Sequence, residues 1–207
     1  MLSAVFQGVF IGLTLAIMVG PYLLFLINTS LSKGKDSANY LAFGVALSDV
    51  VFLSISTISM TWFLKHSTIT EDFSWAGAFF ILAFGIFTVT KKTNFKTEEN
   101  LKPNPKLKIE NMIKGFVFNG LNPSVFVFWF ATVGTILSKN SFSQTQTIAM
   151  LGSIVTTTFT CDLIKIKLAV KFSPLLNQKF IKKVNVIVGS IFILIALYLL
   201  TKTFIIK

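Results

Sequence analysis

The chain has 207 residues, of which 53% are hydrophobic, with a mean hydropathy of +0.75 and a formal net charge of +11. It is too apolar for a soluble domain of this length, so the composition predicts an all-α integral membrane protein. All 19 basic residues are lysines, and they lie almost wholly between apolar runs. That pattern is typical of membrane topology and leaves no folded basic surface for nucleic acid. One cysteine and one histidine exclude an intrachain disulfide and a His/Cys metal cluster.

Six apolar runs reach or approach the roughly 20 residues that a helix needs to cross a membrane. They are Leu2–Leu31, Tyr40–Leu64, Ser74–Thr90, Ile113–Leu137, Thr147–Val170 and Val184–Thr203. The first has no positively charged leader and no cleavage site, so we expect a retained span. Lysines concentrate in the connections after the first, third and fifth runs, which the positive-inside rule places in the cytoplasm. We therefore expect a multi-pass protein of a bacterial cytoplasmic (inner) membrane with both termini outside.

The first and fourth runs are each interrupted at a proline. Gly20 and Pro21 lie inside a run without charge, and the stretch from Asn119 to Pro123 interrupts the fourth run. Because proline lacks a backbone donor and clashes with the preceding turn, the helix must bend or break there. At 1.5 Å per residue, both prolines are predicted to lie roughly 15 Å from the cytoplasmic surface, near the bilayer centre.

Two carboxylates each follow a broken run by one helix. Asp49 is predicted at about the depth of the prolines, and Asp162 slightly nearer the cytoplasm. An acid inside a membrane is more often functional than structural, so Asp49 is the first choice for proton or ammonium coupling, although a protonated core residue is the alternative. Lys165 stands at i+3 from Asp162, where it neutralises this acid, snorkels to the surface or belongs to a gate. Asp162 is therefore the second choice for proton or ammonium coupling.

The half-helices after the two prolines are predicted to begin at the midplane and to run in opposite directions. Both would present free N–H groups and positive dipole ends there, which favour an anion. Asn119, Asn122 and Ser124 lie beside the second break and favour the same ligand. An anion site beside carboxylates suits a zwitterion. The candidate transport residues are Gly20, Pro21, Asp49, Asn119, Asn122, Pro123, Ser124 and Asp162. Trp129 is interpreted as a packing or lipid-facing aromatic.

The two halves of the chain look like repeats. Each has a run broken at a proline, a second run with an aspartate and a third run with a glycine near its start. Three spans per half is an odd number, so the sequence predicts two inverted three-helix repeats. We place the first repeat at residues 1–92, a cytoplasmic linker at 93–112 and the second repeat at 113–207. The prolines and mixed charge of the linker indicate a solvated segment that can touch anionic lipid.

These motifs resemble those of the LysE/RhtB-type amino acid exporters. The family's Pro-Gly-Pro break corresponds to Val19 to Pro21, its glycine- and lysine-containing connection to Lys33 to Lys35, and its second-helix glycine–aspartate pattern to Gly44 to Asp49. Its Asn-Pro-Lys motif corresponds to Asn122 to Ser124. The resemblance covers nearly the whole chain. The sequence departs from the family pattern at Val19, Ser48 and Ser124.

The resemblance implies efflux of amino acids or their derivatives, driven by the proton-motive force, with no cofactor. Ser124 in place of the family lysine favours neutral amino acids over strongly cationic ones. A bundle of this size is compatible with a homodimer. Two other classes stay open, namely efflux of a metal or other small ion held by the two aspartates, and a non-transporting membrane protein. An enzyme is disfavoured because the predicted spans contain no histidine, no glutamate and no nucleophile–base pair.

Overall fold

The computed structural model describes residues 1–17, 21–65, 71–90, 105–139, 142–172 and 178–205, and it confirms that the chain is all-α. Outside the helices, these described residues form only short turns and bends. In chain order the helices are α1 (Leu2–Ile17), α2 (Pro21–Ser32), α3 (Lys35–Lys65), α4 (Glu71–Thr90), α5 (Pro105–Gly120), α6 (Pro123–Lys139), α7 (Gln144–Lys167), α8 (Ala169–Phe172) and α9 (Gln178–Ile205).

Several of these helices suit a membrane by length and composition. α3 and α7 are each long and apolar enough to cross it, and α5 with α6 forms a third span if the bent pair is counted as one. Shorter apolar helices lie at Leu2–Ala16, Tyr22–Ser32, Ile81–Thr90 and Asn185–Thr201. Apart from short breaks such as the one at Leu121 and Asn122, the apolar runs of the sequence are thus helical where the chain is described.

Both predicted helix breaks coincide with helix boundaries. α1 ends at Ile17 and α2 begins at Pro21, whereas Gly20 lies outside the described residues. α5 ends at Gly120, α6 begins at Pro123, and the two helices are bent by 66° relative to each other. Proline suits the first position of a helix because the N–H that it lacks would have no intrahelical partner there.

The start of α5 shortens the predicted linker. The helix begins at Pro105, so the last residues of the expected irregular connection are helical. An ion pair of 2.7 Å between Glu110 and Lys114 supports its first turns. Asn111 is completely buried, and neither of its side-chain polar atoms has a hydrogen-bond partner. Residues 91–104 lie outside the described part of the chain.

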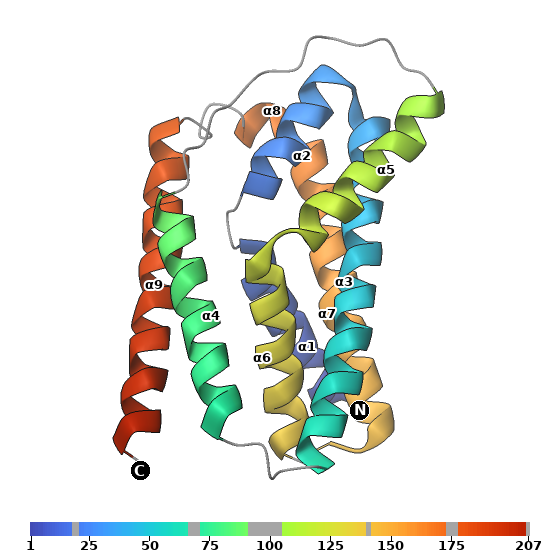
Figure 1. Ribbon diagram of the computed structural model, residues 1–207. Helices are drawn as coiled ribbons and strands as arrows, with labels where there is room; N and C mark the ends of the chain where they lie inside the picture. The colour runs from blue at the N-terminus through green and yellow to red at the C-terminus, as the bar shows by residue number, and fades with distance from the viewer. Residues whose placement is uncertain (18–20, 66–70, 91–104, 140–141, 173–177, 206–207) are drawn as a thin grey trace. The chain divides into compact units, whose positions relative to one another are not determined.

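The chain forms two compact units, and each combines segments from both halves of the sequence. The second unit comprises Thr61–Phe95 and Asn177–Lys207. Within it α4 and α9 lie side by side and run in opposite directions (Figure 1). A Cβ atom added to Gly85 would lie 2.9 Å from the carbonyl oxygen of Gly189, and one added to Gly189 would lie 2.7 Å from that of Gly85. The two glycines therefore allow close backbone packing.

The first unit comprises Met1–Met60 and Lys96–Leu176 and contains both broken helices. α1 and α2 ascend in Figure 1, whereas α5 and α6 descend. α7 packs against α1, and α3 packs against α5. A Cβ on Gly12 would lie 2.9 Å from the carbonyl oxygen of Ile154 on α7, so small residues again set the helix spacing.

Local signals fix the ends of the long helices. α2 is separated from α3 by Gly34, whose φ of 85° lies in the left-handed region that favours glycine at a helix C-terminus. α7 is preceded by a capping box, in which the Ser143 side chain accepts from the Gln146 N–H and the Gln146 side chain accepts from the Ser143 N–H.

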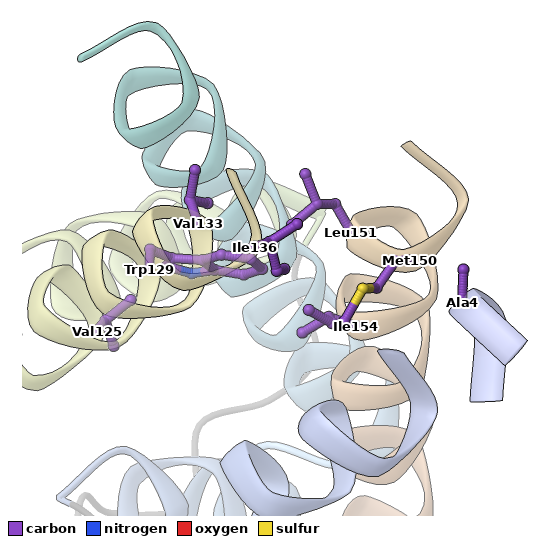
Figure 2. Packing of buried hydrophobic residues seen from close by; sticks show 8 residues of the cluster. All are labelled: Ala4, Val125, Trp129, Val133, Ile136, Met150, Leu151 and Ile154. Atoms are coloured by element: carbon purple, nitrogen blue, oxygen red, sulfur yellow. The ribbon is translucent and has the colours of Figure 1, made fainter. Parts of the chain in front are cut away.

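Two apolar clusters fill the first unit. The Trp129 cluster consists of Ala4, Val125, Trp129, Val133, Ile136, Met150, Leu151 and Ile154. In Figure 2 Trp129 and Ile136 of α6 and Leu151 and Ile154 of α7 point toward one another. The Ile166 cluster consists of Leu26, Ala38, Leu41, Ala42 and Ile166, from α2, α3 and α7. Burial of these side chains supplies the apolar part of the packing between the broken and unbroken helices.

Gly44→Ala tests the close contact between α3 and α5. The added Cβ would overlap the backbone carbonyl of Met112, which no side-chain rotation can relieve, so we expect a loss of about 1–3 kcal/mol in unfolding free energy. Gly152→Ala on α7 is the matched control, because nothing lies within 4 Å of its added Cβ. Helix propensity predicts that this control gains up to about 1 kcal/mol. Thermal unfolding in one detergent compares them, and equal stability of both variants would contradict the contact.

Candidate functional site

Asp49 lies on α3, is only 4% exposed, and is held through one carboxylate oxygen. Its Oδ1 accepts hydrogen bonds from Asn119 Nδ2 at 2.9 Å and from Trp129 Nε1 at 3.1 Å. Asn119 lies at the end of α5 and Trp129 lies on α6, so helices on both sides of the second break converge on this acid. Hydrogen bonds to a charged acceptor are strong, and they offset part of the cost of burying it.

The second oxygen of Asp49 has a different environment. Among the described residues, none donates a hydrogen bond to Oδ2. It can therefore accept a proton or an ammonium hydrogen while the bonds from Asn119 and Trp129 remain.

Asp162 lies on α7, is 6% exposed, and has both oxygens occupied. Oδ1 accepts from Lys165 Nζ at 2.8 Å, and Oδ2 accepts from Tyr22 Oη at 2.7 Å. The ion pair with Lys165 was one of the predicted alternatives for this acid, and it is confirmed. Asp162 is thus paired with a cation, whereas Asp49 is held by neutral donors.

Tyr22 brings the first broken helix to the same region. It directly follows Pro21 at the start of α2, is half-buried, and interacts electrostatically with Asp49 as well as with Asp162. The two acids also interact electrostatically with each other. We call this group the polar layer, which consists of Tyr22, Asp49, Asn119, Asp162, Lys165 and the indole N–H of Trp129.

The polar layer lies between the two apolar clusters along both long helices. On α3, Leu41 of the Ile166 cluster precedes the acid, and Phe52, which packs against the Trp129 cluster, follows it. On α7 the order is reversed, since Ile154 of the Trp129 cluster precedes the acid and Ile166 follows it. Each acid is therefore enclosed by apolar packing toward both ends of its helix.

The residues predicted at the second break differ in what they do. The Asn122 side chain accepts from the Ser124 N–H at 3.1 Å, and its carbonyl accepts from Val125 N–H at 3.0 Å and Phe126 N–H at 3.5 Å. The free N–H groups predicted at the start of α6 are therefore already bonded, because Asn122 caps the helix. Pro123 begins that helix, as Pro21 begins α2.

Sequence reasoning missed Tyr22 and one role of Trp129. Trp129 is completely buried and packs as expected, but its indole N–H also holds Asp49. Each of these side chains joins an apolar ring to one polar group that needs a partner when buried, which was the available signal.

Tyr22→Phe tests the link between α2 and α7. Only the hydroxyl that donates to Asp162 is removed, and we expect a loss of about 1.5–3 kcal/mol in unfolding free energy because the acceptor is charged. Tyr198→Phe is the matched control, since Tyr198 is 65% exposed on α9, and it should leave stability unchanged. If thermal unfolding in detergent gives the same stability for both variants, this hydrogen bond does not hold the helices together.

Comparison with known families supplies the class of protein. The family model of the LysE type translocator matches residues 13–203, a region that includes both helix breaks and both acids. Comparisons with curated proteins and with solved structures find no match. The family match confirms the resemblance that the motifs indicated. The chain therefore belongs to the LysE type translocator family, a family of membrane exporters.

Proposed function

We propose that the protein is a secondary-active exporter of amino acids or their derivatives across the cytoplasmic membrane, coupled to protons through Asp49. The observation that carries this proposal is Oδ2 of Asp49, which accepts no hydrogen bond from the described residues and lies in a polar layer bounded by two broken helices. An acid buried among apolar helices is costly, and such residues mark proton and substrate paths in membrane proteins.

A neutral amino acid fits the charges around this layer. Its ammonium group can donate to Oδ2 of Asp49, which has no other donor among the described residues. Its carboxylate is favoured near the helix starts at Pro21 and Pro123, where the positive ends of the helix dipoles lie. The carboxylate would interact with the dipole of α6 rather than with free N–H groups, because Asn122 already caps that helix.

An arrangement of six spans in two inverted three-helix repeats is part of the proposal. Leu41 and Ile154 precede the acids of α3 and α7 by the same number of residues. The carbonyl of Leu41 meets Gly115 of α5, and the carbonyl of Ile154 meets Gly12 of α1. Each long helix thus supports the first part of the other half's broken helix at an equivalent position, and the two broken helices run in opposite directions (Figure 1). This equivalence supports a duplicated, inverted origin.

The distribution of lysines supports an orientation with both termini outside. The end of α2, the start of α5 and the end of α7 lie at the same end of the first unit (Figure 1). Lys33, Lys108, Lys167 and Lys171 belong to these segments. A cytoplasmic location of this end agrees with the positive-inside rule.

Alternating access follows if the two apolar clusters open in turn. The Ser153 hydroxyl donates to the Val5 carbonyl and the Ser30 hydroxyl to the Ile166 carbonyl, so α1 and α2 are both bonded to α7. α5 and α6 are bonded to α3 in the same way through Asp49. Rocking of α1, α2 and α7 against α3, α5 and α6 would expose the polar layer to one side at a time. The Phe25–Phe118 ring pair, with centroids 5.3 Å apart, links α2 to α5 and would separate during this motion.

An efflux assay tests the function. Cells that express the protein are loaded with a panel of dipeptides, and each free amino acid is followed inside and outside over time. We expect one group of neutral amino acids to leave faster than from cells without the protein, and Asp49→Asn to reduce this efflux to background because the amide cannot carry the proton.

Asp36→Asn is the matched control, since Asp36 is exposed in the first turn of the same helix and should leave efflux unchanged. Membrane content of each variant is measured by immunoblot. Efflux that is as fast with Asp49→Asn as with the wild type would remove Asp49 from the coupling path.

A further inference from the structure

Lys165 places a tethered ammonium group on a buried carboxylate of the polar layer. Its Nζ lies 2.8 Å from Oδ1 of Asp162 within one helix, and the side chain is only 17% exposed. By contrast, Lys167 lies two residues further along α7, is exposed, and makes no ion pair among the described residues. The pairing is thus specific to one of the two lysines at the end of α7.

The group that Lys165 contributes is chemically the group that an amino acid carries. Both are primary alkylammonium ions with three N–H donors and a compact charge. The lysine stem is long and flexible, and Lys167 and Lys171 near the end of α7 are exposed. Side-chain rotation alone can therefore move Nζ away from Oδ1.

The pairing also solves an electrostatic problem. A buried carboxylate is stabilised by a nearby cation, and Lys165 supplies that cation to Asp162. An incoming ammonium group that replaces Lys165 would keep the charge of the layer balanced. Tyr22 occupies only Oδ2, so this exchange at Oδ1 leaves the link from Asp162 to α2 intact.

We propose that Asp162 is a second ammonium site, at which Lys165 stands in for the substrate and is displaced by its ammonium group. This inference rests on the proposed function, which supplies a substrate with a primary amine. Asp49 keeps its role in proton coupling. A tethered competitor lowers the affinity for the substrate, and it returns to Oδ1 when the substrate leaves. That return favours release, which is the step that an exporter must complete.

Chemical replacement of the missing ammonium tests the proposal. Purified Lys165→Ala in detergent is titrated with ethylammonium chloride, and thermal unfolding is measured at each concentration. We expect a saturable rise in the melting temperature, because ethylammonium occupies Oδ1 of Asp162. Tetramethylammonium chloride at equal ionic strength should have no such effect, since it has no N–H donor.

Three further proteins serve as controls. The wild type and Lys167→Ala keep the tethered cation and should need about threefold to tenfold more ethylammonium for any stabilisation. Asp162→Asn combined with Lys165→Ala removes the acceptor charge and should not respond. If Lys165→Ala does not fold, Lys165→Met replaces it, because its unbranched side chain keeps the packing of the lysine stem.

Equal effects of the two ammonium salts on Lys165→Ala, or equal responses of this variant and the wild type, would overturn the proposal. In dipeptide-loaded cells, Lys165→Met should lower the substrate concentration for half-maximal efflux by about threefold to tenfold. If the ion pair were purely structural, its loss in this variant would lower only the maximal rate of efflux. The detergent experiment uses neither an amino acid nor a transport signal. Stabilisation by ethylammonium without any amino acid efflux would therefore support the ammonium site while rejecting the exporter function.

Discussion

The structure depends on two helices that end inside apolar stretches and restart at a proline. In an apolar environment such an interruption must be compensated by protein groups, since no bulk water is available to bond the freed backbone. At the second break, Asn122 supplies that compensation by capping α6 with both its side chain and its carbonyl. The polar residues that the breaks require then become the place where side chains from distant parts of the chain meet.

The two acids in this region have the same charge and opposite surroundings. Asp49 is held by two neutral donors from the other half of the sequence and keeps one oxygen unbonded among the described residues. Asp162 is paired with Lys165 and bonded to Tyr22, so its charge is compensated. This difference supports separate roles, in which one acid exchanges a proton or an ammonium ion directly and the other exchanges one cation for another.

Close backbone packing makes the arrangement of the acids possible. Gly12 and Gly115 let the first parts of the two broken helices approach α7 and α3, which carry the acids. With larger side chains at these positions the helices would be further apart, and the short hydrogen bond from Asn119 to Asp49 could not form. The two glycines, which have no functional side chain, therefore set the positions of the helices that carry the acids.

The sequence was most informative where the signal is local. The breaks at both prolines, the helical nature of the apolar runs and the Asp162–Lys165 pair depend on residues that are neighbours along the chain, and the structure confirms them. The start of α5 was missed because its charged first turns resemble a solvated linker. Tyr22 and Trp129 could not be assigned as partners of the acids, because each partner lies on a helix far away in sequence. The cap by Asn122 was missed because an asparagine beside a break suits a ligand equally well.

Reconstitution into liposomes with imposed proton gradients tests the central claim that Asp49 couples transport to protons. The substrate is an amino acid that the efflux assay identifies, and both gradient-driven uptake and exchange without a gradient are measured. The account predicts that Asp49→Asn retains exchange but no longer responds to the size of the proton gradient, whereas the wild type responds to it. An equal response of the two proteins across the range of gradients would contradict the claim.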